Sequence, residues 1–326
     1  MVTDRYVVGV DGGASKTVAL IGTTDGRILG RGETGPSNYH NVGAVAASRA
    51  IKISVVKAQR QAGLIGRIPE TAVVALAAID STKDKRVVNQ FVQRIRVARE
   101  TFVIHDSVAA LYAATHGKPG IIVNSGTGCF AAGISEAGKY ARVGGWGYLI
   151  DDKGSAFDIG MKAITMAFRM MDGRTPRTKL ISLLRRRFRV GMFDEILNVV
   201  YGNRMSVEEI ARLAPFVSKA ARKDKICREI LKEAGISLAE LACTAARLLK
   251  MTRNSFALVT VGGGFRSGRY LLGPFTFRVR EECPRAHIIN LSIEPAKGAL
   301  LLAAKLSQHG SHVTSQRDGL LSTIAN

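Results

Sequence analysis

Several features that would mark particular protein classes are missing from this sequence. Its four cysteines form no Cys-x-x-Cys pair, which excludes the usual zinc and redox signatures. No window of 18 residues is apolar and free of charge, so we expect no membrane-spanning helix. The first apolar run is too short for a signal peptide. We therefore expect a cytoplasmic protein with reduced cysteines.

Acidic residues are scarce beside basic ones, with 26 Asp and Glu against 47 Lys and Arg and a net charge of +21. Such an excess favours anionic partners, from nucleotides to nucleic acids and acidic membrane surfaces. The densest basic run is Arg185–Arg189. Aromatic residues make up only 6% of the chain, and no aromatic-rich basic stripe accompanies this run. We therefore expect no specific nucleic-acid function and no membrane partner.

The order of the expected elements repeats along the chain. The first half predicts strands and helices in the order β-β-β-α-β-α-β-α, at residues 6–10, 17–22, 27–33, 41–64, 71–78, 83–99, 101–105 and 106–114. The second half starts the same order again, with strands at 120–124, 129–134, 139–143, 256–261 and 286–290 and helices at 266–272 and 296–306. A helical insert is expected at about 155–251. At 326 residues, the chain is long enough for two domains.

This repeat predicts an α/β fold of two domains, each β-β-β-α-β-α. The first domain is expected at residues 1–116, completed by a C-terminal helix at 295–308. The second is expected at 117–294 and carries the helical insert. Residues 310–326 are polar and rich in Ser and Thr, and we predict a disordered tail there.

A glycine-rich hairpin follows the first strand, in the sequence Gly9-Val10-Asp11-Gly12-Gly13-Ala14-Ser15-Lys16-Thr17. The glycine spacing before Lys16 excludes a P-loop, and a strand rather than a helix follows. We predict a phosphate-binding hairpin, with backbone N–H groups from Gly12 and Gly13 and side-chain donors from Ser15, Lys16 and Thr17. Asp11, at the strand end, would hold a magnesium-bound water. A plain hairpin remains the alternative.

Two further glycine turns occupy related positions. Ser125-Gly126-Thr127-Gly128 stands at the equivalent turn of the second copy, where it would hold the triphosphate from the other side. Gly262-Gly263-Gly264 links a strand to a helix near Ser267, and a purine ring can lie on such exposed backbone. Each sequence alone is also compatible with a simple tight turn.

Carboxylates and an isolated tryptophan suggest the acceptor site. Asp106 follows a strand and begins a helix, where it is either a general base or a helix N-cap. Trp146 is the only tryptophan and lies among glycines, shortly before Asp152. An aromatic face with carboxylates is typical of a sugar site. A buried tryptophan beside a turn is the alternative.

Taken together, these motifs resemble the N-acetylglucosamine kinase family, of the BadF-type ATPase group within the actin-like sugar kinase and Hsp70 superfamily. The resemblance covers about residues 6–305. It implies two actin-like (ribonuclease H-like) domains around a cleft, with ATP and Mg²⁺ as cofactors. It also implies phosphoryl transfer to the 6-hydroxyl of a hexosamine, and members of the family are often homodimers.

The resemblance also implies roles for single residues. Asp106 is similar to the catalytic base, and Ser15 and Thr127 match phosphate contacts. The sugar contacts match Asn38, Gly145, Trp146 and Asp152, with Cys129 where the family usually has a serine. The adenosine site matches Gly263 and Ser267, with Ala211 facing the base. A thiol is a weaker hydrogen bonder than a hydroxyl, so Cys129 leaves the specificity for an acetamido sugar open. Lys153 also departs from the family pattern.

Several functions therefore stay open at the level of sequence. The sugar could be N-acetylglucosamine, glucosamine, glucose or another amino sugar, which leaves a glucosamine kinase or a broad hexokinase as alternatives. A sensor that binds sugar without phosphorylating it, and a basic nucleic-acid-binding protein, are two further readings. An activator ATPase of 2-hydroxyacyl-CoA dehydratases would need cysteines for an iron–sulfur cluster, and the cysteine positions do not suit one.

Overall fold

The computed structural model describes residues 5–77, 79, 81–202, 205–290 and 294–308, and it confirms the α/β fold with two five-stranded sheets. Contacts divide the described chain into two compact units. Unit 1 contains the residues up to Pro119, the segment Glu136–Tyr140 and the C-terminal helix, and unit 2 contains Gly120–Ser135 and the residues from Ala141 up to that helix. The tail predicted at 310–326 lies outside the described residues. No described helix is long and apolar enough to cross a membrane.

The sheet of unit 1 has the strand order β3-β2-β1-β4-β5. Its strands are β1 (Tyr6–Gly12), β2 (Thr17–Thr23), β3 (Ile28–Thr34), β4 (Thr71–Leu76) and β5 (Glu100–His105). β1, β2 and β3 form an antiparallel meander, and β4 and β5 run parallel to β1. Every residue of β4 is buried, as expected for an apolar run in the interior of a partly parallel sheet.

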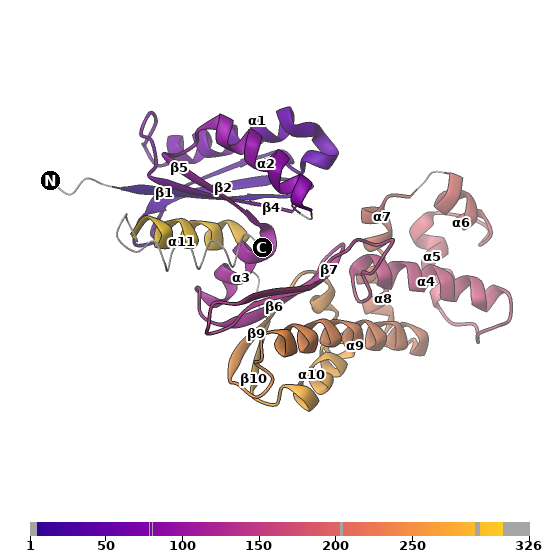
Figure 1. Cartoon of the computed structure of the whole chain (residues 1–326). Helices are drawn as coiled ribbons and strands as arrows, with labels where there is room; N and C mark the ends of the chain where they lie inside the picture. Colours follow the sequence, from indigo (N-terminus) through magenta and orange to yellow (C-terminus); the bar gives the residue numbers. More distant parts are fainter. Residues whose placement is uncertain (1–4, 78, 80, 203–204, 291–293, 309–326) are drawn as a thin grey trace. The chain divides into compact units, whose positions relative to one another are not determined.

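Helices cover both faces of this sheet (Figure 1). α1 (Tyr39–Gln61) and α2 (Thr82–Ile95) lie on one face, and α3 (Asp106–Thr115) and α11 (Pro295–Gln308) lie on the other (Figure 1). A Cβ atom at Gly9 of β1 would lie 2.1 Å from the Leu300 nitrogen. Helix α11 therefore packs directly on the strand that leads into the glycine hairpin.

The sheet of unit 2 has the order β8-β7-β6-β9-β10, which repeats the arrangement of the first sheet. Its strands are β6 (Gly120–Ser125), β7 (Cys129–Ile134), β8 (Tyr140–Gly144), β9 (Phe256–Val261) and β10 (Ala286–Asn290). β7 is antiparallel to β6, and β9 is parallel to β6. The repeat of architecture expected from the sequence is confirmed.

The insert of unit 2 is helical. It contains α4 (Ala156–Met171), α5 (Leu180–Phe188), α6 (Glu195–Leu197), a π turn (Asn198–Gly202), α7 (Val207–Ala211), α8 (Ala214–Ala220) and α9 (Lys225–Leu248). α9 buries one face in the core and packs on α10 (Arg269–Glu282).

Helix α10 differs from the expectation of a helix at 266–272. Residues Gly264–Ser267 form a short 3₁₀ turn, and the α-helix then continues past Pro274. The proline removes one backbone donor, which normally favours a helix end or kink. Burial of Leu271, Phe275 and Val279 keeps the helix continuous through this position.

Candidate functional site

The loop between β1 and β2 is a short hairpin held firmly at its base. The Gly13 N–H donates to the Lys16 carbonyl over 3.0 Å. The Gly13 carbonyl accepts from the backbone N–H groups of Ser37 (3.1 Å) and Asn38 (3.2 Å). Ser15 and Lys16 at the tip are exposed. The hairpin thus presents its tip while its base is fixed to the start of α1.

Two residues of this motif have structural roles. The Thr17 side chain is fully buried, and its Oγ1 lies 2.8 Å from both the Gly35 carbonyl and Ser37 Oγ. A Cβ atom at Gly12 would lie 2.2 Å from Ser37 Oγ. The expectation that the Thr17 hydroxyl donates to phosphate is therefore wrong, because that hydroxyl is buried in contacts to the β3–α1 connection.

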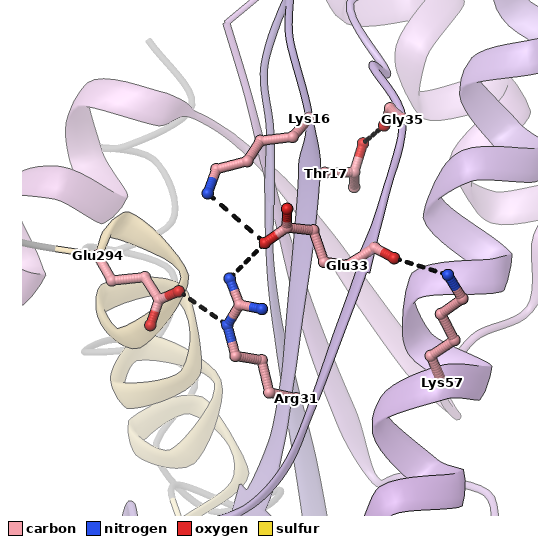
Figure 2. A network of polar contacts seen from close by, with 7 residues as sticks. All are labelled: Lys16, Thr17, Arg31, Glu33, Gly35, Lys57 and Glu294. Carbon is pink, nitrogen blue, oxygen red and sulfur yellow. Dashed lines mark hydrogen bonds and ion pairs between the residues drawn. The ribbon is translucent and has the colours of Figure 1, made fainter.

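Lys16 belongs to a surface network of alternating charges (Figure 2). Its Nζ lies 3.5 Å from Glu33 Oε2, which also pairs with Arg31 at 2.6 Å. Arg31 Nε lies 3.1 Å from Glu294 Oε1. Exposed pairs of this kind contribute about 0–1 kcal/mol. Lys16 can therefore exchange Glu33 for a phosphate at little cost.

Asp11 and Asp106 form a carboxylate pair in unit 1. Asp11 is the penultimate residue of β1, beside the hairpin, and Asp106 begins α3 after β5. Burial raises the pKa of Asp11 to about 7, and the Asp106 charge adds to this rise, while Lys16 opposes it. A buried carboxylate next to another carboxylate is the environment that a divalent cation stabilises.

The helix that begins at Asp106 is capped by another residue. The N-cap is His105, whose Nδ1 accepts from the Ser107 N–H at 3.1 Å. The alternative of Asp106 as the N-cap is therefore wrong. Asp106 Oδ1 lies 2.8 Å from His105 Nδ1, so the carboxylate contacts the imidazole while the imidazole accepts the Ser107 N–H. The carboxylate is thus not consumed by the helix terminus.

Asn38 combines a structural contact with a free amide end. Its Oδ1 accepts from the His40 N–H at 3.1 Å and caps α1. The oxygen is used by the helix, whereas the side-chain NH₂ group makes no hydrogen bond to any of the described residues.

In unit 2, the turn between β6 and β7 is joined to the start of α4. The carbonyls of Gly126 and Thr127 accept from the N–H groups of Ala156 (2.8 Å) and Phe157 (3.4 Å). The Gly126 N–H donates to the Gly128 carbonyl at 2.9 Å. Thr127 is exposed at the tip. The Thr127 hydroxyl can therefore be reached by a ligand, whereas the Thr17 hydroxyl of the first hairpin is buried.

Asp152 packs closely against this turn. Its Oδ1 accepts from the Cys129 N–H at 3.2 Å, and a Cβ atom at Gly128 would lie 2.9 Å from Oδ2. Burial raises the pKa of the Asp152 carboxyl. These contacts fix the carboxylate beside the turn.

Cys129 is placed differently from the expectation. The thiol is buried and donates to the Lys153 carbonyl over 3.2 Å. Burial, and then the charge of Asp152, raise the pKa of this thiol. The proposed sugar contact through the Cys129 side chain is therefore wrong.

Trp146 is 58% exposed, so the alternative of a buried tryptophan is wrong. Its neighbour Gly145 has φ +76°, a conformation that favours glycine. Arg142 donates to the Gly145 carbonyl at 2.7 Å and lies 5.8 Å from the centre of the Trp146 ring. Arg142 therefore supports the loop that presents the indole.

A cavity of about 1280 Å³ in unit 2 brings the predicted nucleotide residues together. Predicted residues from three distant segments line it, namely Gly126, Thr127, Ala211, Gly263 and Ser267. A Cβ atom at Gly262 or Gly264 would clash with Ser125, at 2.3 and 2.0 Å. Those two glycines permit close packing on β6, while Gly263 has open space in front of it.

Sequence reasoning missed the charged residues of this cavity. They are five cations and one carboxylate: Arg212, Lys219, Arg222, Arg266, Arg269 and Glu208. Arg212 and Arg266 directly neighbour predicted residues, which was the available signal. The positive lining suits a ligand with several phosphates. No group of three or more potential metal ligands (His, Cys, Asp or Glu) occurs in the described part of the chain, as is usual for Mg²⁺ held mainly by phosphates and water.

Residues 8–303 match the model of the BadF/BadG/BcrA/BcrD ATPase family. The chain belongs to this family. Membership of the BadF/BadG/BcrA/BcrD ATPase family confirms the resemblance to the BadF-type ATPase group that the motifs indicated.

Two curated proteins that are similar to this member of the BadF/BadG/BcrA/BcrD ATPase family carry the names of amino-sugar kinases. It is 30% identical over 300 residues to the N-acetylmuramic acid/N-acetylglucosamine kinase of Clostridium acetobutylicum, covering 92% of this chain and 98% of the relative. It is 28% identical over 314 residues to the N-acetyl-D-glucosamine kinase of Dictyostelium discoideum, covering 91% and 97%. Both matches span nearly the full length of each chain.

A solved structure supports the same grouping. The crystal structure of a Chromobacterium violaceum protein assigned as an N-acetylglucosamine kinase has a TM-score of 0.74 with this chain. The two are 27% identical, and the match covers 92% of this chain and 99% of the other. The BadF/BadG/BcrA/BcrD fold therefore extends over both units.

Proposed function

We propose that this protein is an ATP-dependent sugar kinase that phosphorylates the 6-hydroxyl of N-acetylglucosamine or a closely related hexosamine. The observation that carries the proposal is the cavity of unit 2, which joins Thr127, Ala211, Gly263 and Ser267 with a cationic lining. A cavity of this composition suits a nucleoside triphosphate. The full-length similarity to amino-sugar kinases supports the acceptor class.

Asp106 acts as the general base in this proposal. A sugar hydroxyl is a poor nucleophile near neutral pH, and a carboxylate in hydrogen-bond reach can take its proton as the new bond forms. The sugar oxygen bonds to the γ-phosphorus, the bond to the β–γ bridging oxygen breaks, and ADP leaves. The Asp106 side chain is 30% exposed, so its carboxylate can be reached by a sugar hydroxyl and can accept that proton.

Each unit contributes a hairpin whose exposed tip would bind phosphate in this proposal. Ser15 and Lys16 are exposed at the first tip and Thr127 at the second. Hydroxyl, ammonium and backbone donors aimed at phosphate oxygens stabilise charge on the transferring group. Thr17 supports the first hairpin from below through Gly35 and Ser37.

Asp11 is the residue that fits Mg²⁺. Burial raises the pKa of its carboxyl to about 7, and among the described residues the charge of Lys16 opposes this rise. Magnesium prefers carboxylate and phosphate oxygens and retains several waters. When bound, it supplies positive charge to the phosphates. Asp11 would hold it directly or through a water molecule.

The acceptor sugar would be held by Asn38, Trp146, Gly145 and Asp152. The Trp146 ring offers an apolar face for sugar C–H groups, and Asp152 offers acceptor oxygens to hydroxyls. The Asn38 NH₂ group can donate, because its oxygen is occupied by the cap of α1. A homodimer remains a prediction.

A coupled assay of ADP release tests the proposal directly. The panel contains N-acetylglucosamine, N-acetylmuramic acid, glucosamine and glucose, each with ATP and Mg²⁺. Preferred turnover of an N-acetylated hexosamine is expected. Preferred turnover of glucosamine or glucose would move the substrate class, and folded protein without sugar-stimulated turnover would overturn the kinase function.

A further inference from the structure

The helical insert of unit 2 contains a second cavity, of about 690 Å³, between α5 and the turn that follows α8. Its polar lining is almost entirely cationic. One group of cations comes from α5 and its two ends, and the other from α8 and the turn: Lys179, Arg186, Arg187 and Arg189, then Lys219, Arg222 and Lys223. The Arg185–Arg189 run of the sequence therefore contributes to a concave site and not only to a solvated face.

These seven cations lack carboxylate partners. Among the described residues, none of them forms an ion pair, in contrast to Lys162 of α4, which pairs with Asp158 and Glu233. Arg187 Nε is buried, and it has no hydrogen-bond partner in the part of the chain that the structure describes. Its guanidinium lies 5.5 Å from the centre of the Phe216 ring. The cluster therefore keeps uncompensated donors and charge.

The single carboxylate in the cavity serves a helix. Asp224 is the N-cap of α9, and its Oδ1 accepts from the Cys227 N–H at 3.2 Å. Like charges gathered in one hollow repel each other unless an anion joins them. The cavity is lined by one carboxylate and seven cations, so an anionic ligand would supply the counter-charge that the lining lacks.

We propose that this cavity binds a small, multiply charged phosphate compound. Guanidinium groups match phosphate oxygens through paired hydrogen bonds, and lysines add point charges. The volume falls in the range of small-molecule sites, roughly 300–1,000 Å³. An extended polynucleotide would instead require a groove with stacking aromatics. Phe216, the single aromatic ring of this cavity, is already engaged by Arg187.

A ligand in this second cavity should affect the proposed nucleotide cavity, because the two cavities share lining residues. Lys219 and Arg222 line both this cavity and the proposed nucleotide cavity. A phosphate compound in the second cavity would draw these two side chains towards itself. Binding of the compound and of ATP should therefore be coupled, and the coupling must be reciprocal.

Isothermal titration with inorganic tripolyphosphate tests the site, in the full-length protein with saturating ATP and without sugar. The wild type should bind one equivalent. The variant Arg186→Gln/Arg189→Gln should bind at least 10-fold more weakly, since both residues line only the second cavity. The control Arg174→Gln/Arg177→Gln removes the same charge from the nearby loop and should stay within 2-fold. Circular dichroism confirms folding, and sugar turnover measured separately keeps this test independent of the kinase proposal.

Three results would overturn the proposal. Equal weakening in both double variants would show a diffuse electrostatic effect. Complete exclusion of tripolyphosphate by ATP would place its binding in the nucleotide cavity. A single-stranded RNA that binds the wild type and loses affinity in the pocket variant, while tripolyphosphate does not bind, would assign the surface to nucleic acid. If tripolyphosphate binds as expected, parallel titrations with pyrophosphate and a hexose 6-phosphate show whether the cavity prefers an inorganic polyphosphate or a phosphorylated sugar.

Discussion

Asp106 Oδ1 lies 2.8 Å from His105 Nδ1, and that same nitrogen accepts the Ser107 N–H that caps α3. The imidazole therefore relieves Asp106 of the capping role that its position at the helix start would otherwise give it. A proton taken up by Asp106 arrives within hydrogen-bond distance of the imidazole. The pair thus joins the Asp106 carboxylate to the capped start of α3.

We predict that Asp106→Asn lowers sugar-dependent turnover by about 10²–10⁴-fold, because the amide cannot take the proton of the hydroxyl. ATP affinity, measured by titration calorimetry, should remain within a few-fold. As a matched control, His105→Asn retains a side-chain acceptor for the Ser107 N–H and should lose far less activity. Unchanged turnover in Asp106→Asn would remove this residue from the chemistry.

The pKa of Asp11 makes a prediction about stability. A folded pKa of about 7, raised from 3.8, means that the folded state holds a proton that the unfolded chain has lost. The free energy of unfolding should therefore fall as pH rises from about 4 to about 7 in metal-free protein. Asp11→Asn removes this penalty and should stabilise the protein at pH 8 by up to about 4 kcal/mol, while it lowers activity.

Urea unfolding in EDTA at pH 4.5 and pH 8 measures this effect. The difference between Asp11→Asn and wild type should be small at pH 4.5 and large at pH 8. Asp194→Asn, at an exposed position of unit 2, should show no such difference. Equal stability of wild type and Asp11→Asn at both pH values would contradict the raised pKa.

Much of the fold was readable because it depends on local alternation and repetition. The apolar runs of β4 and β9 and the two meanders appear at the expected positions. The expected helix at 266–272 stopped before Gly273–Pro274, whereas α10 continues to Glu282. Its continuation depends on packing against α9, and the local sequence does not reveal that contact.

The sequence predicted which loops contribute residues to the candidate site, but it did not predict the direction in which each side chain points. Thr127, Ala211, Gly263 and Ser267, which the family resemblance assigned to the nucleotide, line one cavity. Thr17 faces inward because Gly35 and Ser37, far along the chain, complete its surroundings. Local sequence contains no sign of that contact. Surface arginines such as Arg269 also have no distinctive local pattern.

The opposite roles of Thr17 and Ser15 can be separated by mutation. Thr17→Val leaves the Gly35 carbonyl and Ser37 Oγ without a buried partner and should reduce the free energy of unfolding by about 1–3 kcal/mol. Ser15→Ala, at the exposed tip, should leave stability unchanged and raise the KM for ATP. Urea unfolding and steady-state kinetics on both variants measure the two effects. A stable Thr17→Val with a raised KM for ATP would restore Thr17 as a phosphate ligand.

Gly263 gives a test of where the adenine ring lies. Its backbone is helical, with φ −66° and ψ −29°, and no atom lies within 4 Å of an added Cβ, so Gly263→Ala should fold normally. The new methyl group would occupy the surface on which the ring is proposed to rest, and the KM for ATP should rise about 5–10-fold, a loss of about 1–1.4 kcal/mol. Gly273→Ala is the matched control, because Gly273 lies in α10 with equally open space and outside the nucleotide cavity. That control should leave the KM for ATP unchanged, and its Cβ ahead of Pro274 should not raise the stability. If Gly263→Ala also leaves the KM for ATP unchanged, the ring does not lie on this loop, and Ala211 becomes the residue to test.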